Sequence, residues 1–356
     1  MKNLFTAFLS MFIVACSTPE KNANSKIDIY DDSVLDIIDI YSEIEVLADS
    51  ISLPEGPVWD EASQSLLFVD VMGNKLYRWN ENDGTSEYIS PSGNTGYAPN
   101  VDFGLLGANG LLIDENGDII LCQHGDRRLA KINNSSTNSP SFTTLVDNYE
   151  GGRFNSPNDL TYASNGDIYF TDPAFGFFNL ETFQFVESEL KDLNFNGVYK
   201  YNTKSGELSL VTDKIDLPNG IALSPDEKTL YVAETEGGKL YGFDIIGEGE
   251  INKIQFPHSI NGGKLLNNEG GIKRFDSLAV EKNGNICVGT LFNGGISVIS
   301  PSGDLVEFIK FEDPYITNIC FGSKDLKTAY ITASYKGHLL EVKWDREGLP
   351  LNFLNK

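Results

Sequence analysis

The sequence predicts an all-β fold, a six-bladed β-propeller with a metal site in its central channel. A strand–turn–strand unit recurs six times along the chain, every 42 to 61 residues. Residues that favour strands and tight turns are abundant, with 22 Phe, 15 Tyr, 34 Gly and 14 Pro among 356 residues. An oxygen-bearing side chain stands at the same position in every unit. Together these observations favour radially arranged blades whose inner strands share one channel.

The first residues have the features of a lipoprotein signal peptide, predicted over residues 1–15. A basic start is followed by the apolar run 4–15, which has the length of a signal-peptide core, and then by Cys16. Because Ile13-Val14-Ala15-Cys16 resembles the bacterial lipobox, we expect Cys16 to be lipidated and residues 16–41 to be a polar tether and lead-in. The expected location is the bacterial cell envelope, on the periplasmic or outer-membrane face. An ordinary secretory signal with a chance cysteine is the alternative.

The overall charge limits the partners that the chain can take. Asp and Glu total 51 against 27 Lys and Arg, which gives a net charge of −24. This charge repels phosphate backbones, so we expect no nucleic acid partner. Membrane attachment is expected only through the lipid anchor, because no later segment is apolar enough to span a bilayer. The expected oligomeric state is a monomer.

The remaining cysteines are predicted to be buried, unpaired thiols. Cys122, Cys287 and Cys320 each lie in an alternating apolar run. Their spacing matches no zinc-site pattern and the three His residues are scattered, so a zinc site of His and Cys is not expected.

The propeller is predicted over residues 42–356. Each unit has an apolar strand, a turn rich in Asn, Gly, Asp and Ser, and a second β-branched or aromatic strand. A single four-stranded sheet cannot bury both faces, whereas six arranged radially can. Residues 42–47 precede the first unit and are expected to complete the last blade, which closes the ring. The units begin at Val58, Leu111, Leu160, Ile221, Leu278 and Ile319.

A carboxylate or amide side chain stands seven residues before the turn of every unit. Innermost strands line the channel of a propeller, so side chains at one phase converge on its axis. Such an all-oxygen cage suits Ca²⁺, which takes about six to eight oxygen ligands. Alternatively, these residues cap strand starts or form Asx turns. The six residues are Glu55, Asn109, Asn158, Asn219, Asp276 and Asn318.

With these residues in place, the chain resembles the gluconolactonase/regucalcin (senescence marker protein) family of six-bladed, calcium-dependent propellers, and within it the bacterial gluconolactonase-like branch. The resemblance implies four metal ligands, with Asp276 also the catalytic acid/base and with Arg153 and Asp159 on the substrate side. It implies one divalent cation, first Ca²⁺, with Mg²⁺, Mn²⁺ or Zn²⁺ as alternatives. The matching motifs are LPEGPVW from Leu53, RFNSPNDL from Arg153, LPNGIA from Leu217 and DSLAV from Asp276. The implied ligands are Glu55, Asn158, Asn219 and Asp276.

The activity expected from this resemblance is metal-dependent hydrolysis of a sugar lactone. The cation would polarise the lactone carbonyl, and Asp276 would take a proton from the attacking water and return it to the ring oxygen. No G-x-S-x-G motif is present, which counts against an α/β-hydrolase mechanism. Two alternatives stay open: hydrolysis of another lactone, ester or organophosphate, and a non-catalytic propeller that binds a glycan or a protein.

Three further features have two interpretations each. His124, at the end of the second unit, is either a hydrogen-bond donor to the substrate at the channel mouth or a structural histidine. Asn109 and Asn318 are the ring members most suited to a structural role or to contact with substrate or water. The aromatic-rich insertion over residues 176–197 is either a lid over the mouth or a segment packed on a blade edge.

Overall fold

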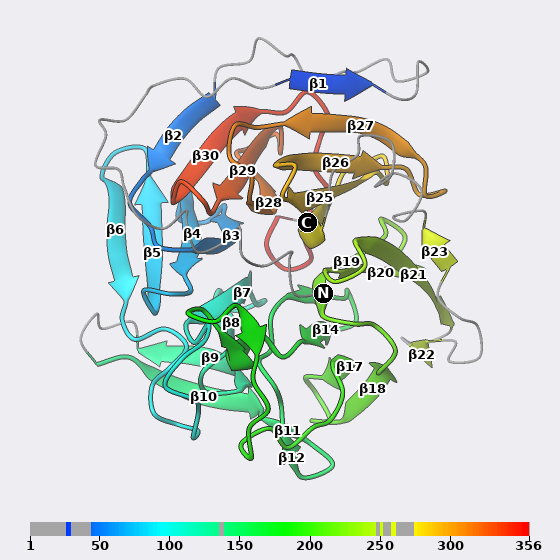
Figure 1. The fold of residues 1–356 in the computed structure, drawn as a ribbon. Coiled ribbons are helices and arrows are strands. Elements are labelled where there is room, and N and C mark those ends of the chain that lie inside the picture. Colours follow the sequence, from blue (N-terminus) through cyan, green and yellow to red (C-terminus); the bar gives the residue numbers. More distant parts are fainter. Residues whose placement is uncertain are drawn as a thin grey trace.

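The computed structural model describes residues 26–29, 44–134, 139–246, 250–251, 258–260 and 274–355. These residues form strands and loops, with one short 3₁₀ helix, η1 (Phe175–Phe177). Six antiparallel sheets stand around a central axis (Figure 1), which confirms the predicted six-bladed propeller. No helix among these residues is long and apolar enough to cross a membrane. The signal peptide 1–15, Cys16 and most of the lead-in 16–41 lie outside the described residues.

Each blade begins with its innermost strand and runs outward. Blade 1 contains β3 (Pro54–Asp60), β4 (Ser65–Asp70), β5 (Lys75–Asn80) and β6 (Gly84–Ile89). Blade 2 contains β7 (Ala108–Ile113), β8 (Ile119–Gln123), β9 (Arg128–Asn134) and β10 (Ser141–Val146). Blade 3 contains β13 (Leu160–Tyr162), β14 (Asp167–Asp172), β17 (Gly197–Asn202) and β18 (Leu208–Thr212).

The remaining blades follow the same plan. Blade 4 contains β19 (Pro218–Leu223), β20 (Thr229–Glu234) and β21 (Lys239–Ile246), with β22 (Glu250–Ile251) and β23 (His258–Ile260) both paired to β21. Blade 5 contains β24 (Arg274–Val280), β25 (Ile286–Leu291), β26 (Gly295–Ile299) and β27 (Leu305–Lys310). Blade 6 contains β28 (Ile316–Gly322), β29 (Thr328–Ala333) and β30 (His338–Lys343).

The outer strand of blade 6 comes from the beginning of the propeller. β2 (Ile44–Ala48) pairs antiparallel with β30, with Ile44 opposite Val342 and Val46 opposite Leu340. This pairing confirms that the segment before the first unit completes the last blade. This closure joins the beginning of the propeller to its last blade and covers the outer edge of β30.

A second N-terminal strand adds to the neighbouring blade. β1 (Lys26–Ile29) pairs antiparallel with β27 and gives blade 5 a fifth strand. These residues fall in the segment expected to be a polar tether. Their sequence, KIDI, alternates polar and apolar residues as a strand does, and the outer edge of β27 offers unpaired backbone groups.

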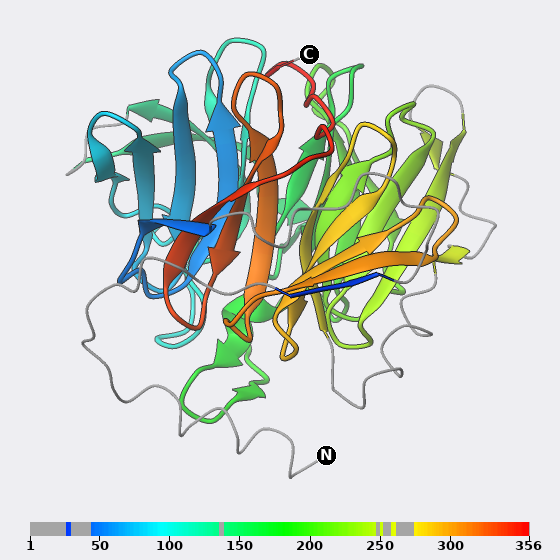
Figure 2. The same ribbon diagram turned by 90° about the horizontal axis from the view of Figure 1, so that it is seen from above.

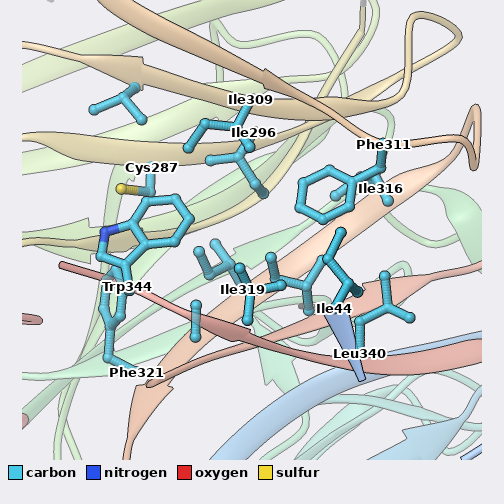
Figure 3. Packing of buried hydrophobic residues seen from close by; sticks show 14 of the residues in the cluster. Ile44, Cys287, Ile296, Ile309, Phe311, Ile316, Ile319, Phe321, Leu340 and Trp344 are labelled. Carbon is cyan, nitrogen blue, oxygen red and sulfur yellow. The ribbon is translucent and has the colours of Figure 1, made fainter. Parts of the chain in front are cut away.

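Buried side chains between adjacent blades form the core. The largest cluster lies between blades 5 and 6 and includes Ile44 of β2, Cys287, Ile296 and Trp344 (Figure 3). Because Ile44 is buried there, the closing strand contributes to the core as well as to the sheet. Burial of one such side chain stabilises the fold by about 1.5–3 kcal/mol. The free thiols Cys122, Cys287 and Cys320 are all buried, as predicted.

After β30 the chain crosses the propeller face as a C-terminal strap (residues 344–355). The strap lies on the opposite face from the insertion 176–197 (Figure 2). Arg346 anchors the strap to blade 5, since its guanidinium binds the buried carboxylates of Glu281 and Glu307. Farther along, Leu349 N donates to Val280 O at 2.8 Å and Asn352 Nδ2 donates to Tyr162 O at 2.9 Å. The strap therefore links blades 5 and 3 across the axis.

Candidate active site

The six oxygen-bearing residues lie at one end of the innermost strands. Five of them are in β3, β7, β19, β24 and β28, and Asn158 stands two residues before β13. All six side chains are buried. These innermost strands contact one another in order around the axis. We call this set, Glu55, Asn109, Asn158, Asn219, Asp276 and Asn318, the oxygen ring.

A β-bulge accompanies the oxygen ring in five blades. In β3 the three steps from Glu55 to Val58 lie opposite only two steps in β4, from Val69 to Leu67. The register shifts beside the ring residue in β7, β19, β24 and β28 as well. An extra residue in one strand bends that strand and redirects its side chains. The bulge therefore recurs at the same distance before the turn in each of these five units.

Glycines next to the ring residues let adjacent blades approach closely. Gly56 has a φ of +53°, and a Cβ there would lie 2.1 Å from the carbonyl oxygen of Asn109. One blade further, Gly110 N donates a 2.7 Å hydrogen bond to Asn158 O. Only glycine combines a positive φ with this approach of backbone to backbone.

Three carboxylates are buried together in the channel. Burial raises the pKa of Asp276 well above its ordinary value, and the charges of Glu55 and Asp159 raise it further. Burial likewise raises the pKa of Glu55, and it raises the pKa of Asp159 to about 7. Buried like charges are costly unless a cation compensates them. A divalent cation would lower all three pKa values by stabilising the ionised forms.

Two amide oxygens of the oxygen ring show where a cation fits. Asn109 Oδ1 and Asn158 Oδ1 are buried and accept no hydrogen bond within the described part of the chain. An orphaned buried oxygen costs about 1–3 kcal/mol, which a bound cation or water would offset. Nowhere in the described residues do three His, Cys, Asp or Glu side chains group as metal ligands. Amide oxygens of the oxygen ring, with Asn158 Oδ1 the ligand left without a partner among the described residues, are therefore needed to complete a ligand set with Glu55 and Asp276. This all-oxygen donor set fits Ca²⁺.

Asn219 and Asn318 are held by neighbouring blades. Asn219 Nδ2 donates to Thr235 Oγ1 at 3.1 Å, and its Oδ1 accepts a 3.4 Å contact from Ser277 Oγ. Asn318 Nδ2 donates to Glu55 Oε2 at 2.9 Å, while its Oδ1 accepts the backbone N–H of Ile319. Both ends of each amide are thus engaged: the Asn219 oxygen faces Ser277 of blade 5, and the Asn318 nitrogen faces Glu55 of blade 1. A structural role for Asn318 is the simpler of its two interpretations.

Asp159 lies deeper in the channel than the oxygen ring. Its Oδ1 accepts Leu160 N at 2.9 Å and its Oδ2 accepts Ile221 N at 3.4 Å, so it bridges blades 3 and 4. It lines the same channel pocket as Gly56 and Asn318. Its implied role on the substrate side stays a prediction.

His124 is brought directly against the oxygen ring. It is 1 % exposed, its Nδ1 lies 3.0 Å from Leu105 O, and its Nε2 lies 3.5 Å from Asn158 Nδ2. Burial lowers the pKa of His124 to about 4, so the imidazole is neutral at physiological pH. Its partners in the structure are thus a backbone carbonyl and a ring amide.

Arg153 lies outside the oxygen ring, on the short hairpin formed by β11 (Asn148–Tyr149) and β12 (Gly152–Arg153). Its guanidinium lies 3.6 Å from Asp147 Oδ2 and 5.6 Å from the centre of the Tyr97 ring. Its Nη1 is buried without a hydrogen bond to the described residues. The substrate-side role implied for Arg153 stays a prediction.

A sequence model of the SMP-30/gluconolactonase/LRE-like region matches residues 53–335 of the chain. The chain belongs to this family. A gluconolactonase of Zymomonas mobilis is 34% identical over 304 residues, which span 84% of this chain and 81% of that protein. A 6-deoxy-6-sulfogluconolactonase of Pseudomonas putida is 24% identical, over 83% of this chain and 89% of its own.

Solved structures share the architecture of this SMP-30/gluconolactonase family member. A gluconolactonase from Xanthomonas campestris superposes with a TM-score of 0.72 at 24% identity, covering 93% of this chain and 99% of that one. A calcium-binding regucalcin from Agrobacterium tumefaciens gives a TM-score of 0.67 at 15% identity, covering 87% and 97%. At these identities the comparison establishes the common fold, and the family resemblance drawn from the motifs is confirmed.

The insertion 176–197 lies on one face of the propeller. It begins within η1 and contains a small hairpin of β15 (Phe178–Asn179) and β16 (Gln184–Phe185), which projects from the face opposite the strap (Figure 2). Phe178 packs on Phe185 with 5.1 Å between ring centres. The insertion thus has its own aromatic contacts and stands on the face where the inner strands begin. Its two interpretations, a lid over the mouth or a segment packed on a blade edge, both stay predictions.

Sequence reasoning missed the residue that holds the base of this insertion. Arg127 is 2 % exposed and donates to the backbone carbonyls of Phe154, Leu190 and Arg153. The adjacent pair Arg127-Arg128 in an otherwise acidic chain was the available signal.

Proposed function

We propose that this protein is a divalent-cation-dependent sugar lactonase whose active site is the oxygen ring. Its family makes it a carboxylic-ester hydrolase of the lactonase type. One observation carries the metal assignment, namely that orphaned amide oxygens and buried carboxylates meet at one end of the channel. We assign the cation to Glu55, Asn158, Asn219 and Asp276, with Ca²⁺ as the preferred ion because every donor is oxygen.

The cation, when bound, supplies a Lewis acid that polarises the substrate carbonyl and stabilises the negative charge that develops on its oxygen. Asp276 serves as the general base and accepts a proton from the attacking water at its carboxylate. It then returns that proton to the ring oxygen of the lactone as the acyl bond breaks. Hydrogen bonds from the Asn219 side chain and the Ser277 backbone to Asp276 lower its pKa and so oppose the effect of burial.

The support for a sugar lactone rests on the relatives and on the polarity of the site. The Zymomonas mobilis and Pseudomonas putida relatives are a gluconolactonase and a 6-deoxy-6-sulfogluconolactonase. Asn109 Oδ1 lacks a partner among the described residues and can accept a hydrogen bond that a substrate hydroxyl donates. Arg153, near Tyr97 and Asp147, is the basic residue we assign to polar groups of the substrate outside the oxygen ring.

The deciding experiment measures hydrolysis of a panel of sugar lactones by metal-stripped protein, with Ca²⁺, Mg²⁺, Mn²⁺ or Zn²⁺ added back singly. We expect no turnover without metal and restored turnover with Ca²⁺. A matched panel of aliphatic lactones, aryl esters and organophosphates tests the substrate class. Full activity in excess chelator would overturn metal dependence, whereas turnover of aryl esters alone would overturn the sugar lactone. Metal-dependent stability without turnover of any compound would favour the non-catalytic propeller.

A further inference from the structure

His124 lies in a turn at the channel mouth whose backbone is held by hydrogen bonds. It begins the turn between β8 and β9, and three backbone hydrogen bonds join this turn to the connection that precedes β7. These bonds run from His124 N to Gly107 O, from Gly125 N to Leu106 O, and from Asp126 N to Gly93 O, at 3.3, 3.0 and 2.8 Å. The backbone that carries the imidazole is therefore fixed to blade 2.

The contacts of the imidazole define its tautomer. Nδ1 faces the carbonyl oxygen of Leu105 at 3.0 Å, and a carbonyl can only accept, so Nδ1 carries the hydrogen. Nε2 of the neutral ring is then an acceptor, and it faces the amide nitrogen of Asn158 at 3.5 Å. The acceptor is thus aimed at the amide nitrogen and away from the amide oxygen.

We infer that His124 is a positioning residue that orients the Asn158 amide so that its oxygen faces the metal site. An asparagine amide has two rotated states of nearly equal shape, one presenting Oδ1 and the other presenting Nδ2. His124 Nε2 stabilises only the first state, because an oxygen placed against this nitrogen lone pair would be repelled. The amide oxygen, which has no hydrogen-bond partner among the described residues, is therefore the atom available to a cation.

This inference rests on the proposed metal site and goes beyond it, since it gives His124 a role other than the substrate contact considered from the sequence. Outer partners of metal ligands commonly change metal affinity by about 10- to 100-fold. Leu105 contributes indirectly to the orientation of Asn158. Its carbonyl accepts the hydrogen on Nδ1 of His124, which leaves Nε2 as the hydrogen-bond acceptor.

Calcium affinity measured by titration calorimetry on the full chain tests the inference. His124→Leu, which keeps volume but removes the acceptor, should weaken Ca²⁺ binding by about 10- to 100-fold. His124→Gln, which retains an acceptor near the Nε2 position, should recover most of that loss. In the Asn158→Asp background there is no amide to orient, so adding His124→Leu should change the affinity by less than about threefold. Equal losses in both backgrounds would overturn the inference.

Asn158→Ala separates this inference from the proposed function. If Asn158→Ala leaves Ca²⁺ affinity unchanged, the metal assignment itself is wrong. If Asn158→Ala weakens binding but His124→Leu does not, only the role of His124 is wrong. Should His124→Leu fail to fold, ¹⁵N NMR of the unmodified protein decides the question. We expect a proton on Nδ1 and an Nε2 resonance that shifts when Ca²⁺ is added; a proton on Nε2, or an Nε2 resonance that does not shift, would overturn the inference.

Discussion

At the scale of single residues, Asp276 must satisfy two requirements that can be separated by mutation. As a ligand it needs an oxygen directed at the cation, whereas as an acid/base it needs a carboxylate that titrates. Its position beside Glu55 and Asn219 is compatible with both roles. Replacement by asparagine separates the two roles, because the amide keeps an oxygen for the cation but cannot accept the proton.

We therefore predict that Asp276→Asn lowers lactone hydrolysis by about 10²–10⁴-fold even at saturating Ca²⁺, the usual scale of acid–base catalysis. Metal binding should weaken but stay measurable. The control is Asn219→Asp, which keeps an oxygen ligand and leaves the base in place, and which should retain substantially more activity. Near wild-type turnover by Asp276→Asn would make this residue a ligand only. The kcat at saturating metal is the quantity to compare.

Asp172 provides a pH prediction away from the oxygen ring. Its carboxylate accepts the backbone N–H groups of Asn155 and Ser156 at 2.8 and 2.7 Å, and burial raises its pKa from 3.8 to about 7. The folded state therefore binds an extra proton between these values. The stability contributed by this group is fully present below about pH 4 and is lost as the pH rises through about 7.

The expected result is a free energy of unfolding that falls less steeply between about pH 4 and pH 7 in Asp172→Asn than in wild type. Urea unfolding in excess chelator measures this slope without a contribution from bound metal. The slope, rather than the absolute stability, is compared, because the substitution also replaces a hydrogen-bond acceptor. Identical slopes in the two proteins would show that Asp172 does not titrate in this range.

At the scale of elements, the bulge and the following glycine determine how closely the innermost strands approach. Gly56 and Gly84 both have a positive φ, +53° and +69°, but they differ in surroundings. A Cβ on Gly56 would meet Asn109 O at 2.1 Å, whereas a Cβ on Gly84 would meet no atom within 4 Å. Alanine substitutions at these two glycines therefore distinguish the cost of backbone strain alone from the added cost of a clash between blades 1 and 2.

We predict that Gly84→Ala costs about 1–2 kcal/mol, the strain of a left-handed residue, and that Gly56→Ala costs clearly more. Gly56→Ala should also weaken Ca²⁺ binding, because it displaces blade 2 relative to Glu55. Denaturant unfolding and calorimetric titration give the two quantities. Equal stability losses would mean that the contact between blades 1 and 2 relaxes at no cost.

At the scale of the whole molecule, a cation in the oxygen ring would connect blades 1, 3, 4 and 5, which supply the four proposed ligands. Without the cation, the buried carboxylates of Glu55 and Asp276 repel one another and oppose the close approach of the blades that carry them. Metal binding and ring closure are then linked, because an ion that binds only the folded state stabilises it.

Glu55→Gln is expected to affect the melting temperature differently with and without metal. In chelator its melting temperature should equal or exceed that of wild type, since one buried charge has been removed. With saturating Ca²⁺ it should gain less than wild type, since one charged ligand is missing. Thermal unfolding followed by circular dichroism under both conditions measures the effect. A calcium-induced rise as large as that of wild type would remove Glu55 from the ligand set.

The sequence predicted the parts of this molecule that repeat. Turn residues and alternating strands recur in each unit, so the six blades, the position of β2 and the phase of the oxygen ring followed from spacing alone. The contact between His124 and Asn158 could not be predicted in the same way, because it depends on the Leu105 carbonyl, which lies in the connection before β7 and outside the repeated unit. β1 and the strap were missed because each binds a surface that only the folded propeller presents.

The strap also has a mechanical consequence. Ile44 at the start of β2 lies opposite Val342 near the end of β30, so tension on the two chain ends would peel these strands apart one hydrogen bond at a time. Such unzipping needs little force. Arg346 lies just beyond β30 and is held by Glu281 and Glu307 of blade 5. A force applied at the C-terminus therefore reaches β30 only after this anchor has broken, so a buried ion pair protects the closing strand pair from a pull at that end.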